Sequence, residues 1–139
     1  MEYGRKPLLF CLGGAGYVGL ELLWRGRSHG SMFLAGGCCF LILGALDRRI
    51  RHLPWVLRGL ICSGVITAVE LAVGLIFNRD YGVWDYRHLP LNFLGQICVP
   101  FSALWALLGM GAILLYRAAD HRVDRICSSL SRSSSRKPA

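Results

Sequence analysis

Acidic, basic and imidazole side chains gather in the short stretch ELLWRGRSHGSMF, residues 21–33, which lies between two apolar runs. It contains Glu21, Arg25, Arg27 and His29. Glu21 precedes Arg25 by four residues, the order that favours an ion pair on the surface of a helix. Such a group could bind an ionic solute, transfer a proton, or join neighbouring helices through ion pairs.

A further acid, Glu70, stands inside a long apolar run, residues 53–77. A carboxylate in a membrane-spanning helix costs about 2.5–3.5 kcal/mol on insertion scales, so it usually faces the interior of the helix bundle and has a partner. Arg25 and Arg27 are the candidate partners. Three interpretations stay open: the charges latch the helices together, they form a substrate or ion site, or the acids are protonated and solitary.

A third polar stretch, NRDYGVWDYRHLPLN, covers residues 78–92, and Gln96 follows it closely. Its aromatic residues are typical of the belt at a membrane–water interface. Together the three stretches define a candidate polar cluster: Glu21, Arg25, Arg27, His29, Glu70, Asn78, Asp85, Asn92 and Gln96.

The sequence offers little for catalysis or cofactor binding. His29 has no second histidine at ligand spacing, so we expect no metal site. Acid–base work by Glu21, His29 and Glu70 would lack an accompanying nucleophile. There is no G-x-x-x-x-G-K-[ST] phosphate loop, so the chain cannot hydrolyse ATP by that route. We therefore expect neither an enzyme nor a cofactor.

The elements that position these residues follow from composition. The chain has 139 residues, of which 54% are hydrophobic, and its charges fall in short blocks between uncharged apolar runs. This pattern is typical of a membrane protein with several spans. The net charge of +8 could indicate nucleic acid, but Lys and Arg beside membrane spans account for it, and we expect no nucleic-acid partner. The six cysteines include no C-x-x-C pair, and no disulfide framework is indicated.

The apolar runs predict an all-α bundle of about four transmembrane helices within one domain, residues 1–117, with spans near 7–24, 31–46, 53–77 and 94–116. The apolar part of the second run, residues 32–46, is short for a hydrocarbon core of about 30 Å. Pro100 lies inside the fourth predicted span, where it favours a kink.

Lys and Arg are distributed unevenly between the two ends of these spans. Eleven fall in the N-terminal segment, the second connection and the C-terminal tail, against four in the other two connections. The positive-inside rule then places both termini in the cytoplasm and the polar cluster at the outer side. Arg58, about one turn inside the third span, is expected to extend toward the cytoplasmic interface.

Small residues repeat every four positions on two of the predicted spans: Cys11, Ala15 and Gly19 on the first, and Gly64, Ala68 and Ala72 on the third. Such ridges let helices approach closely in lipid, so one hypothesis has the first and third spans in contact. The alternative is that these residues are simply common in membrane helices.

The tail, residues 118–139, changes character. Val123, Ile126, Cys127 and Leu130 follow helical spacing, with basic residues between them. We expect a short amphipathic helix on anionic lipids of the inner leaflet, followed by a disordered basic end in SRSSSRKPA.

Several motifs in this order carry a resemblance: GYVGLELLWRGRSHGSMFLAGG, then Glu70 within an apolar run with Asn78 after it, then VWDYRHLPLNFLGQICVPFS. The chain, from about Gly16 to Leu108, resembles the bacterial family of small multi-span membrane proteins described as Putative ABC-transporter type IV. The resemblance implies a permease-like component of a transport system in the bacterial inner membrane. A separate chain would supply the ATPase, and a homo-oligomer or a larger membrane partner would complete the pathway. The alternative is a structural or regulatory membrane protein whose polar cluster is a helix latch.

Overall fold

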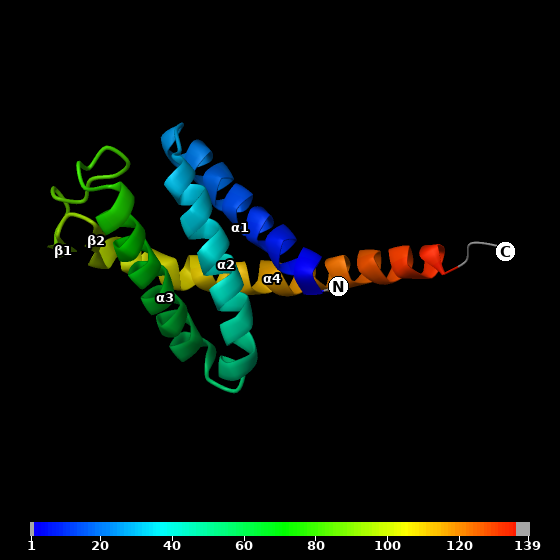
Figure 1. The fold of residues 1–139 in the computed structure, drawn as a ribbon. Helices are drawn as coiled ribbons and strands as arrows, with labels where there is room; N and C mark the ends of the chain where they lie inside the picture. Colours follow the sequence, from blue (N-terminus) through cyan, green and yellow to red (C-terminus); the bar gives the residue numbers. More distant parts are fainter. Residues whose placement is uncertain (1, 136–139) are drawn as a thin grey trace.

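The structure is a computed structural model that describes residues 2–135. It consists of four long helices and a minimal β-hairpin (Figure 1). The helices are α1 (Glu2–Arg25), α2 (Gly30–Ile50), α3 (Trp55–Phe77) and α4 (Val99–Ser134). All four are long and apolar enough to cross a membrane. This confirms the predicted all-α membrane bundle.

The helices pack as two pairs, and α2 connects one pair to the other. α1 lies against α2 along its length, α3 lies against α4, and α2 contacts both α3 and α4. α4 runs obliquely across the other three and extends beyond them toward the C-terminus (Figure 1). Leu60, Leu107 and Leu114 are exposed while Trp105 and Ile113 are buried. Exposed leucines on long apolar helices are expected where the surrounding solvent is lipid.

The predicted contact between the first and third spans is wrong, because α1 packs against α2 instead. Among the described residues, no atom outside the local backbone of the same helix lies within 4 Å of a Cβ placed on Gly19 or Gly64. The glycines that permit close approach are others: a Cβ on Gly36 of α2 would lie 2.5 Å from the Cβ of Tyr17 on α1. A Cβ on Gly109 of α4 would lie 2.5 Å from the Cβ of Cys62 on α3.

The second span is longer than its apolar core. α2 has 21 residues, about 31 Å of helix, enough to cross the hydrocarbon layer. At its start, Nδ1 of His29 accepts a hydrogen bond from the backbone N–H of Ser31 and so caps the first turn. At its other end α2 continues through charged residues to Ile50.

The fourth helix begins at Val99, five residues later than predicted. The residues before it form β1 (Asn92–Phe93) and β2 (Ile97–Cys98), paired antiparallel with Asn92 opposite Cys98. Pro100 therefore stands in the first turn of α4, where its missing N–H leaves no helical hydrogen bond unmade. It gives no reason for a kink, in contrast to the prediction.

The tail is not a separate helix. α4 continues through residue 117 to Ser134 without a break. Val123 is buried together with Ala119, Leu9 of α1 and Phe40 of α2, so part of the predicted lipid-binding face packs inside the bundle. Residues 131–134 are helical rather than disordered, and residues 136–139 lie outside the described part of the chain.

Candidate functional site

The candidate polar cluster occupies the end of the bundle where α1 joins α2 and where the long connection between α3 and α4 lies (Figure 1). The structure divides the nine predicted residues into five groups with different surroundings.

The predicted ion pair between Glu21 and Arg25 forms on the last turns of α1. Arg25 Nη1 also donates a hydrogen bond of 2.9 Å to the backbone oxygen of Val83 in the α3–α4 connection. One guanidinium thus ties α1 to a segment 58 residues away in the chain. Arg25 Nε is buried and has no hydrogen-bond partner within residues 2–135. This group connects the end of α1 to the α3–α4 connection.

Glu70 is not paired with Arg25 or Arg27. Its two carboxylate oxygens accept hydrogen bonds from the hydroxyl of Tyr86 at 2.8 Å and from Nε1 of Trp105 at 2.9 Å. Burial and the nearby carboxylate of Glu70 raise the pKa of Tyr86 above its usual value, so its hydroxyl stays protonated and donates. The predicted arginine partner is therefore wrong: two neutral donors from the α3–α4 connection and α4 hold this carboxylate.

Asn78 and Gln96 form a buried hydrogen-bond network with Trp84. Asn78 Nδ2 donates to the backbone oxygen of Trp84 at 2.7 Å, and its Oδ1 accepts from the backbone N–H of Val83 at 2.8 Å. Trp84 Nε1 donates to the backbone oxygen of Gln96 at 2.9 Å. All three side chains are buried. Their hydrogen bonds hold the α3–α4 connection against the end of α3.

Asp85 and Asn92 serve the exposed part of the same connection. Asp85 binds the guanidinium of Arg87 through two hydrogen bonds, of 2.7 and 2.9 Å. The hydrogen bonds from Arg87 hold the pKa of Asp85 at about 2. Asn92 Nδ2 donates to the backbone oxygen of Leu89 at 2.9 Å, and its Oδ1 accepts from the N–H of Gly95. Among the described residues, neither side chain has a hydrogen bond to Glu70.

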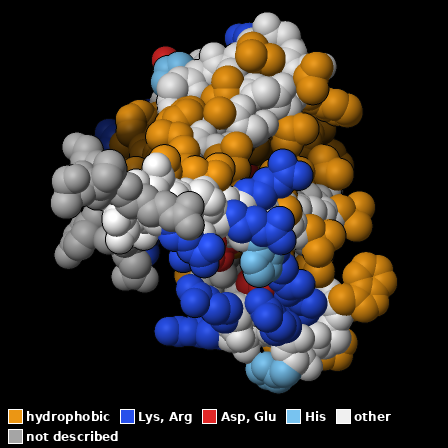
Figure 2. Space-filling view, turned by 90° about the vertical axis from the view of Figure 1, so that its right-hand side faces the viewer, with side chains coloured by type: hydrophobic (Ala, Val, Ile, Leu, Met, Phe, Trp, Pro, Cys, Tyr) orange, Lys and Arg blue, Asp and Glu red, His pale blue; other side chains and the backbone are white. Residues whose placement is uncertain are grey.

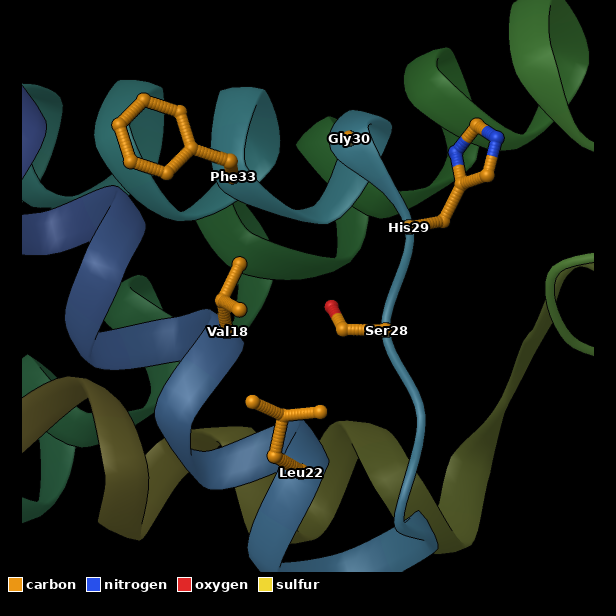
Figure 3. Close-up of a pocket in the computed structure, with 6 residues that line it drawn as sticks. All are labelled: Val18, Leu22, Ser28, His29, Gly30 and Phe33. Carbon is orange, nitrogen blue, oxygen red and sulfur yellow. The ribbon is translucent and has the colours of Figure 1, made fainter.

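His29 and Arg27 do not reach Glu70 either. His29 caps α2, and Arg27 is exposed. A cavity of about 330 Å³ opens beside them, lined by Val18, Leu22, Ser28, His29, Gly30 and Phe33. Figure 3 shows the hydroxyl of Ser28 directed into it and the imidazole of His29 directed away. The cavity wall is largely apolar, with no charged side chain in its lining.

The sequence reasoning missed two sets of residues. The sequence places Tyr86 in a stretch typical of an interfacial aromatic belt and gives no signal at Trp105, yet these two residues supply the partners of Glu70. At the opposite end of the bundle, Asp47 is buried and binds Arg58 at 3.0 Å, so Arg58 pairs within the protein instead of extending to the interface. The spacing of Asp47 and Arg51, four residues apart, was the available signal.

Within residues 2–135, no three histidine, cysteine or acidic side chains gather closely enough to hold a metal ion. The arrangement can bind or release a proton or a cation at Glu70, and it can hold the connections in place through Arg25 and Asn78. These are the chemical roles that the geometry supports.

The model of the family described as Putative ABC-transporter type IV matches residues 21–136. The chain belongs to this family. The match begins at Glu21 and continues through the C-terminal part of α4, so it includes the tail. The resemblance drawn from the sequence ended at about Leu108 and left the tail out. No curated protein and no solved structure matches the chain.

Proposed function

We propose that this member of the type IV family is the permease-like membrane component of a transport system in the bacterial inner membrane, and that its ATPase is a separate chain. Membership of the family and four helices able to cross a membrane support the class. The sequence contains no G-x-x-x-x-G-K-[ST] phosphate loop, which is consistent with an ATPase on a separate chain. A homo-oligomer or a further membrane partner completes the pathway, because four helices are few for one translocation path.

The observation that carries the proposal is the environment of Glu70. It lies seven residues before the end of α3, about 10 Å from that end by helical rise. Its carboxylate faces Tyr86 and Trp105, and among the described residues no cationic side chain forms a salt bridge with it. Ionisable residues inside membrane spans usually mark solute or ion pathways. In this proposal, the carboxylate of Glu70 binds a proton or a cationic group of the solute along the pathway.

The test is purification of the tagged full-length protein from its own host in mild detergent, followed by reconstitution into vesicles and measurement of ATP hydrolysis. We expect an ATP-binding-cassette ATPase to co-purify and Glu70→Gln to change the hydrolysis rate at least about tenfold. Abundance should stay equal to that of the wild type. Asp80→Asn, in the exposed connection, is the matched control because it removes one carboxylate from the same end of the bundle.

A second candidate is a structural or regulatory membrane protein in which the cluster is a latch. The buried network of Asn78, Gln96 and Trp84 and the bridge from Arg25 to Val83 favour it. Under this function no ATPase co-purifies, and Glu70→Gln lowers abundance and melting temperature instead of a catalytic rate.

A further inference from the structure

The basic end of the bundle contains a buried acid shared by three arginines. Asp47, on the last turns of α2, has a side chain only 3% exposed. It accepts hydrogen bonds from Arg51, which follows α2, from Arg58 of α3 and from Arg117 of α4. The two bonds from Arg117 measure 2.7 and 2.8 Å, and those from Arg51 and Arg58 measure 3.1 and 3.0 Å. We call these four residues the Asp47 cluster.

The Asp47 cluster carries more positive charge than its acid neutralises. One carboxylate faces three guanidiniums, each of which has five N–H donors, and the four bonds to Asp47 leave most of those donors free. Arg58 Nε is buried and has no hydrogen-bond partner in the part of the chain that the structure describes, whereas the side chain of Arg51 is 59% exposed. Figure 2 shows the face of the molecule that contains the connection between α2 and α3. Lys and Arg side chains gather over its lower half, with acidic side chains between them.

Exposed apolar side chains lie directly beside this charge. Trp55, Val56 and Leu60, on the first turns of α3, are all more than 60% exposed. Arg58 stands on the same turns. Guanidiniums next to a large apolar surface fit a ligand that has both an anionic group and hydrocarbon, and arginine binds phosphate oxygens through parallel hydrogen bonds. A tryptophan at the edge of the apolar surface is typical of headgroup depth.

We propose that the Asp47 cluster binds the phosphate of an anionic phospholipid in the leaflet at the basic end of the bundle, with the lipid chains against the exposed start of α3. Asp47 holds the three guanidiniums in place, and the free N–H groups of Arg51 and Arg117 bind the phosphate. This site differs from the expected attraction of the tail to anionic lipid, because it is built from α2, the α2–α3 connection, α3 and α4 together. It does not depend on the proposed transport function.

The test is native mass spectrometry of the full-length protein in mild detergent, titrated separately with phosphatidylglycerol, phosphatidylcholine and inorganic phosphate. We expect phosphatidylglycerol to bind at least about fivefold more tightly than phosphatidylcholine, and inorganic phosphate not to compete at millimolar concentration. Arg51→Gln should weaken phosphatidylglycerol binding about fivefold. The chosen residue is the most exposed member of the cluster, so the fold should tolerate its loss. Arg27→Gln, an exposed arginine at the opposite end, is the control and should bind as the wild type does.

Arg117→Gln supplies a second variant, with its melting temperature measured in parallel to separate folding from binding. Equal binding of phosphatidylglycerol by wild type, Arg51→Gln and Arg117→Gln would overturn the proposal. So would equal binding of phosphatidylcholine, or competition by inorganic phosphate, which would indicate a site for free anions. An equal loss in Arg27→Gln would show a general charge effect and would also overturn it.

Discussion

The side-chain amides of Asn78 and Gln96 bind each other at the end of α3: Asn78 Nδ2 donates to Gln96 Oε1, and Gln96 Nε2 donates to the backbone oxygen of Asn78, both at 3.0 Å. Asn78 is completely buried. The pair fixes both ends of the connection between α3 and α4, because Asn78 closes α3 and Gln96 precedes α4 by three residues. Tyr86, which binds Glu70, lies between them.

Replacing Asn78 with alanine should therefore destabilise the protein strongly. The change leaves the buried backbone N–H groups of Val83 and Trp84 without an acceptor, and each unsatisfied group costs about 1–3 kcal/mol. We expect a loss of about 3 kcal/mol, measured as a lower melting temperature in detergent. Asn92→Ala removes the same amide from an exposed position and should cost at most about 1 kcal/mol. Similar losses in both variants would contradict the structural role of the buried network.

The bridge made by Arg25 predicts coupling between α1 and the α3–α4 connection. Arg25→Ala removes both the pair with Glu21 and the hydrogen bond to Val83. Because the side chains of Arg25 and Glu21 are both partly exposed, we expect the free energy of unfolding to fall by only about 1–2 kcal/mol. In a double-mutant cycle, Glu21→Gln should cost little once Arg25 is absent. Strictly additive effects would mean that the ion pair contributes nothing.

Close helix packing at Gly36 predicts a sharp difference between two glycines. Gly36→Val places a side chain against Tyr17, and overpacking of this kind costs about 1–3 kcal/mol. Gly64→Val is the matched control, since it has the same change in helix propensity and no atom within 4 Å of the new Cβ. Melting temperatures in detergent should fall for the first variant and stay near the wild-type value for the second. A larger fall for Gly64→Val than for Gly36→Val would instead support the predicted contact between the first and third spans.

The pair of Asp85 and Arg87 predicts an acid limit for the exposed connection. The pKa of Asp85 is about 2 in the folded protein, below about 3.9 for a free aspartate. Its contribution to stability is therefore fully present above about pH 4 and is lost as the pH falls through about 2. A carbon NMR titration of the labelled carboxyl group should show this midpoint. Arg87→Gln should move the midpoint up toward about 3.9, and an unchanged midpoint would show that Arg87 is not the cause.

The helices were predictable because hydrocarbon imposes a simple rule on the sequence. A span needs about 20 apolar residues, and this rule located all four helices. It could not place their ends. α2 runs past its apolar part because Asp47 is neutralised by arginines from other elements, and α4 starts late because residues 92–98 form a hairpin. Both causes are tertiary contacts that one segment does not reveal.

The candidate site was predictable in its membership more than in its pairing. Glu21 and Arg25 pair as their spacing indicates, since both lie on one helix. Glu70 and its partners Tyr86 and Trp105 come from three separate segments, so only the folded connection shows that they meet. Charge reasoning also favoured an arginine for Glu70, whereas the structure uses neutral donors. The same limit hid Arg117, which meets Asp47 across 70 residues of chain.

The uninterrupted course of α4 has a mechanical consequence. Its 36 residues make a rod of about 54 Å, well beyond the roughly 30 Å of a hydrocarbon layer. The helix is continuous through Arg117, the residue that binds Asp47. A displacement of the C-terminal turns of α4 would therefore be transmitted along the helix to the ion pair of Arg117 with Asp47.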